Sequence, residues 1–144
     1  MSKGSFETIL AQDGRLVYSN VGDSMMPLLR EGRDLVVIEP VNRRLKRYEV
    51  PLYRRESGQY VLHRILRVRK NDYVICGDNR WGLETGVTDN QILGCLTAVV
   101  RNGETISVSD PRYQLYVHLW CDLFPLRAFL LRTGHWIRKR LRRK

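Results

Sequence analysis

The chain has 144 residues, of which 43% are hydrophobic, which suits one folded domain and excludes a disordered chain. Its net charge of +10 is uneven: residues 1–110 contain 16 Lys and Arg against 14 Asp and Glu, whereas residues 111–144 contain 9 against the single Asp122. Because the first part is nearly neutral, the composition argues against a domain built to grip nucleic acid.

The first predicted elements lead to a short motif that contains a serine. Apolar spacing over Phe6–Gln12, followed by a glycine, predicts a short helix, and alternation over Arg15–Asn20 predicts a strand. The chain then reaches Gly22-Asp23-Ser24-Met25-Met26-Pro27. Proline is favoured at the first helical position, so we expect a short helix over residues 27–30 whose free N–H groups point toward the serine. Leu35–Ile38 should be a buried strand.

The next part of the chain alternates between strand patterns and turn residues. Asn102-Gly103 is the strongest hairpin signal in the sequence, and Ser57-Gly58 is a second turn signal. A loop rich in special backbone residues is expected over residues 77–82. The predicted strands are Tyr48–Arg54, Gln59–Arg69, Tyr73–Cys76, Gln91–Arg101 and Glu104–Val108. Residues 1–109 should therefore form a small, mainly antiparallel β domain.

Residues 110–144 have a different pattern and are predicted to be an amphipathic, helical, basic tail. Gln114, His118 and Asp122 recur every fourth residue and predict one polar stripe on a helix, which Pro125 should break or restart. Two roles stay open for residues 113–144: docking on the β domain, or peripheral contact with a membrane. In the second case the aromatic side chains at the interface would be Trp120, Phe124, Phe129 and Trp136.

A serine that acts as a nucleophile needs a base to remove its proton. The chain has three histidines, His63, His118 and His135. His63 lies within a predicted strand, 39 residues after Ser24. A lone histidine in a strand is usually incidental, so this pairing gains weight only from its surroundings.

Three motifs, in this order and spacing, resemble the signal-peptidase/LexA-type clan of serine peptidases over about residues 15–103: Gly22-Asp23-Ser24-Met25-Met26-Pro27, His63-Arg64-Ile65 and Gly77-Asp78-Asn79-Arg80. The resemblance implies a partly open, coiled antiparallel β structure with the nucleophile at Ser24 and the general base at His63. Bacterial signal peptidases and LexA-type repressors have lysine in the base position. The endoplasmic-reticulum and archaeal signal peptidases have histidine, as this chain does.

The resemblance also implies an acid that orients the base. Glu84 is the favoured candidate, and Asp78 and Asp89 remain alternatives. A histidine with an unperturbed pKa of about 6.5 is a usable base without deep burial. The backbone of Gly22, Asp23 and Ser24 would bind substrate and the oxyanion, and Met25 would line the substrate cleft. This mechanism needs no metal or cofactor.

Two positions depart from the family pattern. Gly22 stands where signal peptidases usually have serine, and Tyr48-Glu49 stand where the family tends to have Gly-Asp, which concerns only a turn. Only 23 residues precede the serine, with neither a membrane anchor nor a DNA-binding domain, so we do not expect repressor-style self-cleavage.

The sequence therefore predicts a serine endopeptidase that cleaves a precursor or leader peptide. The alternative is a catalytically inactive adaptor of the same fold that binds peptides or is tethered to a membrane. The first residues lack an export signal, and the odd number of cysteines (Cys76, Cys95 and Cys121) suits a reducing compartment. We expect a cytoplasmic protein, at most peripheral at the inner membrane face.

Overall fold

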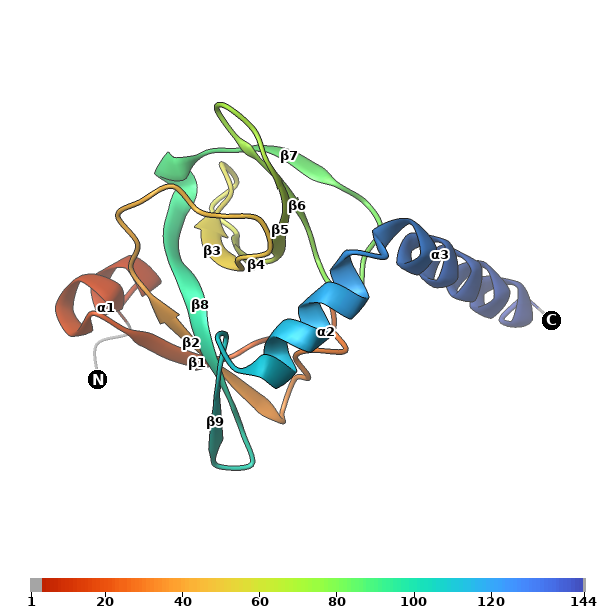
Figure 1. Cartoon of the computed structure of the whole chain (residues 1–144), viewed down its shortest axis with the longest axis horizontal. Coiled ribbons are helices and arrows are strands. Elements are labelled where there is room, and N and C mark those ends of the chain that lie inside the picture. Colours follow the sequence, from red (N-terminus) through yellow and green to blue (C-terminus); the bar gives the residue numbers. More distant parts are fainter. Residues whose placement is uncertain (1–3, 144) are drawn as a thin grey trace.

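The computed structural model describes residues 4–143 as a β body followed by two helices (Figure 1). In chain order the elements are α1 (Phe6–Asp13), β1 (Leu16–Ser19), β2 (Asp34–Glu39), β3 (Pro51–Arg54), β4 (Tyr60–Leu62), β5 (Arg64–Val68), β6 (Tyr73–Cys76), β7 (Glu84–Val87), the short 3₁₀ turn η1 (Asp89–Gln91), β8 (Ile92–Arg101), β9 (Glu104–Ser107), α2 (Pro111–Cys121) and α3 (Phe124–Leu141).

The strands form two antiparallel sheets. The larger has the order β1-β2-β8-β3-β4, with β9 also paired to β8, and the smaller has the order β5-β6-β7. Asn102 and Gly103 have φ values of 52° and 76°, the left-handed pair that a tight hairpin turn requires, and they join β8 to β9 as predicted. The prediction of a mainly antiparallel β body is confirmed.

The larger sheet curls into a half-barrel, which brings its two outer strands toward each other. Phe6 of α1 fills the space between them: its ring centroid lies 4.9 Å from that of Tyr18 in β1 and 4.7 Å from that of Tyr60 in β4. Glu7 accepts a hydrogen bond from the Tyr60 hydroxyl at 2.7 Å. The predicted N-terminal helix therefore forms and bridges the two edges of the sheet.

The hairpin β3–β4 separates two hydrophobic clusters. Leu52 and Leu62 are partners in the register and contribute to the cluster beneath α1 and α2. Their neighbours Tyr53 and Val61 point the other way, into the cluster shared with β5, β6 and β7. The three cysteines are free and buried, as small apolar residues would be.

One strand prediction is wrong in a way that matters for the site. Residues 59–69 were expected to form a single strand, but the chain leaves the larger sheet after Leu62 and enters the smaller one at Arg64. His63 lies at this switch point. The strand-like pattern resumes directly after it, because Val61 and Leu62 before the break and Ile65 after it are all buried.

The helix expected over residues 27–30 is also absent, and Ser24 to Leu28 form consecutive turns instead. The amide of Met26 donates to the Asp23 carbonyl at 3.1 Å, and that of Leu29 donates to the Met25 carbonyl at 2.9 Å. A segment this short gains little from helix propagation, and burial of Leu28 and Leu29 fixes its course instead. No helix dipole therefore points at Ser24.

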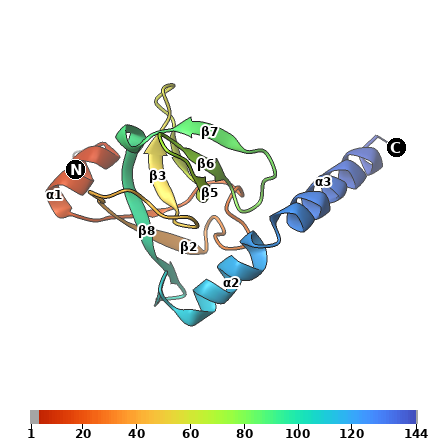
Figure 2. The ribbon, with the colours of Figure 1, turned by 45° about the horizontal axis from the view of Figure 1, so that its top comes forward.

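The two C-terminal helices differ in how they meet the body. Tyr113, Val117 and Cys121 of α2 belong to the hydrophobic cluster under the larger sheet, so the sequence boundary at residue 109 is not a boundary in packing. In contrast, α3 projects away from the body (Figure 2). Within residues 4–143, no helix has both the length and the apolar character needed to cross a bilayer.

Candidate functional site

Ser24 lies on a turn that is anchored from beneath. Its side chain is partly exposed, whereas Met25 is 0% exposed and its sulfur accepts the Asp78 amide at 3.4 Å. Met25 therefore supports the turn from inside the core and does not line an open surface, in contrast to the role that the sequence suggested.

The Gly77-Asp78-Asn79-Arg80 motif lies against this turn and holds it by its backbone. The Asn79 amide donates to the Ser24 carbonyl at 2.9 Å, and the Asn79 side chain donates to the Asp23 carbonyl at 3.1 Å. Arg80 pairs with the Asp23 carboxylate at 2.7 Å, and this hydrogen bond lowers the pKa of Asp23. Two of the three sequence motifs thus meet in space.

Gly77 is the point where the third motif joins them. A Cβ atom at Gly77 would lie 2.6 Å from the Ser24 carbonyl oxygen and 3.2 Å from His63 Nε2. Both atoms therefore approach one point, and only glycine leaves the room for them to do so. The Ser24 backbone carbonyl and the His63 imidazole therefore lie close to each other at Gly77, although within residues 4–143 no hydrogen bond joins the Ser24 hydroxyl to the imidazole.

His63 is held in its neutral form. Burial, and after it the nearby positive charge of Arg55, lower its pKa to about 4, although the negative charge of Glu84 acts in the opposite direction. A neutral imidazole at pH 7 has a free lone pair and can accept a proton from a serine hydroxyl.

Glu84, the favoured acid, lies near His63 but is engaged elsewhere. Its carboxylate accepts from the Tyr53 hydroxyl at 2.6 Å and pairs with Arg55 at 2.8 Å. Partial burial alone would raise the pKa of Glu84, but the hydrogen bonds from Arg55 and Tyr53 lower it overall. Glu84 therefore acts on His63 through its charge, without a direct hydrogen bond in this structure.

The other two acids have different surroundings. Asp78 forms a fully buried, bidentate ion pair with Arg64 at 2.8 and 2.9 Å and also accepts from the Tyr116 hydroxyl of α2 at 2.8 Å. Asp89 pairs with Arg44 at 2.9 Å. Asp78 thus ties the motif loop to α2, and Asp89 lies at a separate ion pair.

The backbone N–H groups near Ser24 differ in whether they already donate a hydrogen bond. The Gly22 amide donates to the Glu31 carboxylate at 2.8 Å, so it is occupied. Within the described part of the chain, the amides of Asp23 and Ser24 donate to no acceptor. These two N–H groups are therefore the ones that could meet a developing oxyanion.

The sequence did not point to the C-terminal helices as supports of the site. Trp120 donates its indole N–H to the Asp78 carbonyl at 2.7 Å, as docking on the β domain, the first of the two roles left open for the tail, would require. Arg127 of α3 is buried and donates to the carbonyls of Gly77 at 3.1 Å and Arg80 at 3.3 Å. The one feature of the sequence that could have indicated this role is the position of Arg127 within an apolar stretch. Tyr48 has φ 73° and a hydroxyl that donates to Asp122 of the segment between α2 and α3.

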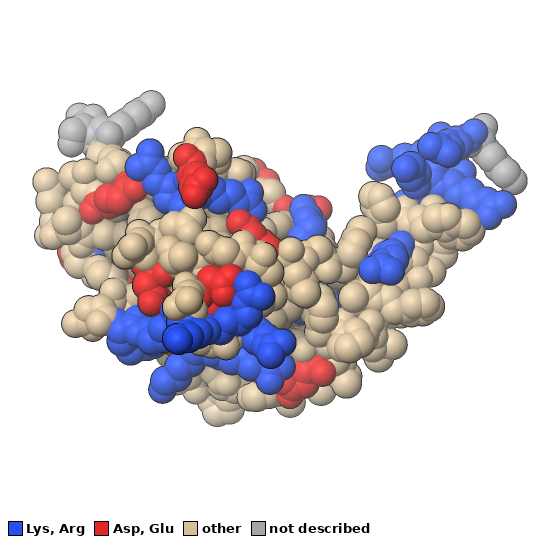
Figure 3. All heavy atoms as spheres, turned by 90° about the horizontal axis from the view of Figure 1, so that it is seen from above, with Lys and Arg blue, Asp and Glu red and all other residues tan. Residues whose placement is uncertain are grey.

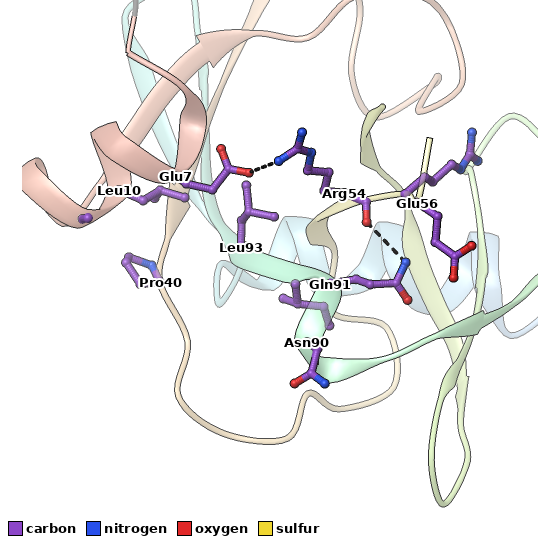
Figure 4. Close-up of a pocket in the computed structure, with 11 residues that line it drawn as sticks. Glu7, Leu10, Pro40, Arg54, Glu56, Asn90, Gln91 and Leu93 are labelled. Carbon is purple, nitrogen blue, oxygen red and sulfur yellow. Dashed lines mark hydrogen bonds and ion pairs between the residues drawn. The ribbon is translucent and has the colours of Figure 1, made fainter. Parts of the chain in front are cut away.

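Two hollows on the surface lie near these elements. One, of about 540 Å³, lies between α1 and the ends of β3 and β8 and includes neither Ser24 nor His63 (Figure 4). Its charges are mixed, since Glu7 faces Arg54 across it at 3.4 Å. The other, of about 780 Å³, separates the Ser24 turn from α3. Within residues 4–143, no three His, Cys, Asp or Glu side chains gather as metal ligands would.

Comparison with known proteins adds no assignment. No family model matches the chain, and no curated protein matches it either. The function must therefore be argued from the geometry around Ser24.

Proposed function

We propose that the chain is a serine endopeptidase of the signal-peptidase/LexA type that cleaves a precursor or leader peptide. The observation that supports the proposal is the approach of the Ser24 backbone carbonyl and His63 Nε2 to one point at Gly77, where both residues are partly exposed. A neutral base beside a serine is the arrangement that nucleophilic acyl transfer requires.

In the proposed reaction, Ser24 Oγ attacks the scissile carbonyl while His63 accepts the hydroxyl proton. The amides of Asp23 and Ser24 stabilise the oxyanion, which is where fixed donors contribute most. His63 then protonates the leaving amine, and the C–N bond breaks to leave an acyl ester on Ser24. Water, deprotonated by His63, hydrolyses the ester, and the released serine oxygen takes the proton back.

The proposed substrate is an extended peptide laid between the free edges of β1 and β4. β1 leads toward Ser24 and β4 ends next to His63, so a strand added there would reach both groups. Phe6 covers this gap. Entry of a peptide would therefore require α1 to move aside.

Labelling with a fluorophosphonate, followed by intact-mass analysis, tests the proposal. The wild type should gain one adduct, and Ser24→Ala and His63→Ala should gain none. Ser57→Ala, at the hairpin turn, and His118→Ala, at an exposed histidine, are matched controls that should label normally. Adducts on Ser24→Ala, or undiminished precursor cleavage by that variant, would contradict the assignment.

A second candidate is a catalytically inactive adaptor of the same fold, one that binds peptides or is tethered to a membrane. It is favoured by the missing hydrogen bond between the Ser24 hydroxyl and His63. Binding of a peptide without any labelling or cleavage would support the adaptor over the enzyme.

We further propose a cytoplasmic location with peripheral contact at the inner membrane face. The buried thiols of Cys76, Cys95 and Cys121 are free, as in a reducing compartment. On α3, the side chains of Leu126, Leu130 and Ile137 form one exposed stripe, and basic residues flank it. An anionic bilayer would complement both the apolar stripe and the charge.

Co-sedimentation with vesicles tests the membrane contact. The wild type should bind vesicles that contain phosphatidylglycerol and should bind pure phosphatidylcholine weakly. Leu126→Gln with Leu130→Gln should abolish binding, whereas Leu83→Gln, an equally exposed leucine on the body, should not. Equal binding by both variants would exclude the α3 stripe as the contact.

A further inference from the structure

The cleft between the Ser24 turn and α3 has a strongly positive wall. Four basic side chains at the C-terminal end of α3 line it, and the opposite side carries Asp23 and Arg80; the four are Arg138 and Lys139 of α3, and Arg142 and Arg143, which directly follow the helix. Figure 3 shows the free end of α3 covered by Lys and Arg. Asp23 and Met26 line the cleft, so it lies next to the turn that carries the proposed nucleophile.

Few carboxylates of the described residues offset the positive charge of this wall. Among residues 4–143, Asp23 is the one carboxylate that lines the cleft, and it already pairs with Arg80 at 2.7 Å, while the more distant charge of Arg138 also lowers the pKa of Asp23. Within the same residues, none of the four cations forms a salt bridge with a carboxylate. The cleft therefore has an excess of unpaired donors that suit an anion.

The arrangement of the cations is costly for the helix itself. Arg138 and Arg142 are four residues apart, as are Lys139 and Arg143, and like charges at this spacing repel each other. The C-terminal end of a helix favours positive charge, but this preference does not select the face toward the cleft. A negatively charged ligand in the cleft would relieve the repulsion.

The position of α3 is fixed well enough to present these charges. Arg127 anchors its first turn to the motif loop, and the ring of His135 lies 5.5 Å from that of Trp81. The cations therefore face the cleft at a set distance from the Ser24 turn.

We propose that this cleft binds an acidic segment of the substrate polypeptide, next to the scissile bond and beyond the strand edges. The assignment deepens the proposed function, on which its use of a peptide substrate rests. An acidic peptide fits better than nucleic acid, because residues 1–110 are nearly neutral in net charge and the body side of the cleft carries a carboxylate, Asp23.

Fluorescence anisotropy with a dye-labelled hexaglutamate peptide tests the assignment. Binding is measured on full-length Ser24→Ala protein, so it does not depend on catalysis. The cleft variant is Arg138→Glu with Arg142→Glu. The control is Arg132→Glu with Arg140→Glu, which changes the net charge of α3 equally but does not alter the cleft lining.

The hexaglutamate should bind, and hexaglutamine should not. The cleft variant should weaken binding roughly tenfold, because two attractive pairs become repulsive. The control should weaken it by less than about twofold, since exposed charges outside the cleft are screened by salt.

Three results would overturn the assignment: no binding of hexaglutamate, equal losses in both variants, or tighter binding of an oligothymidylate of the same charge. The last would indicate a nucleic-acid site. If the cleft binds the acidic peptide but the wild type labels with no fluorophosphonate, the peptidase proposal fails while the binding site stands.

Discussion

Acid should destabilise this protein through His63, and replacing His63 should remove that effect. The folded state holds the pKa of His63 near 4, mainly through burial and then through the charge of Arg55. In the unfolded chain the same imidazole has a pKa of about 6.5. Between these values the unfolded state binds a proton that the folded state does not.

The sign and the size follow from linkage. Because the folded pKa is depressed, the contribution of His63 is intact above pH 6.5 and becomes a growing penalty as the pH falls toward 4. With these two pKa values, the free energy of unfolding falls by about 2 kcal/mol between pH 7 and pH 5. For a chain of this size such a loss lowers the Tm by roughly 4–8 °C.

Urea titrations at pH 7 and pH 5 measure the loss directly. His63→Gln should lose about 2 kcal/mol less than the wild type over this interval. His135→Gln replaces an exposed histidine on α3 and should retain the wild-type dependence. If the wild type and His63→Gln lose equal stability, then burial does not depress the pKa of His63 in the folded state.

Three further predictions concern the supports of the site. Asp78→Asn leaves a buried guanidinium unpaired and should cost roughly 3–5 kcal/mol in urea unfolding, whereas Asp89→Asn breaks an exposed pair and should cost less than about 1 kcal/mol; equal costs would show that burial does not set the difference. Gly77→Ala should abolish fluorophosphonate labelling by displacing the nucleophile or the base, and Gly82→Ala, with open space at its Cβ, should label like the wild type. Phe6→Ala should increase the rate of peptide cleavage, since α1 then leaves the gap more readily; an unchanged rate would place the peptide elsewhere.

Much of the β body could be predicted because local signals and burial agree. Asn102-Gly103 specifies its turn by backbone conformation alone, and the run Leu35–Ile38 is apolar because β2 lies in the middle of the sheet with its residues mostly buried. The helix α1 also carries its own boundaries, with the Ser5 side chain as a cap and Gly14 in the left-handed conformation.

The strand switch at His63 could not be predicted from local patterns. Apolar residues lie on both sides of His63 and Arg64, and this pattern looks the same whether the chain stays in one sheet or passes between two cores, because both environments bury those apolar residues. β7 was missed for a related reason: its pattern is mostly exposed and contains Gly86 at φ 80°, so neither alternation nor propensity marks it.

For the candidate site, the sequence located the motifs but not their partners. The meeting of Ser24, His63 and Gly77 follows from long-range contacts, yet all three lie within motifs that the sequence had singled out. The engagement of Glu84 by Arg55 depends on how β7 lies against the β3–β4 hairpin, which no local pattern encodes. The burial of Arg127 likewise depends on where α3 starts relative to the motif loop.

The passage of the chain from one sheet to the other at a single residue limits where its length can change. An extra residue at Ser57-Gly58 would only enlarge an exposed turn, which hairpins tolerate. An extra residue between Tyr60 and Leu62 would move every following side chain, as far as His63 where the chain changes sheets, to the opposite face of the strand. The imidazole would then point away from the serine, while the composition of both cores would be almost unchanged. Homologues that differ in length should therefore differ at the turn and keep the same number of residues from β4 to β5.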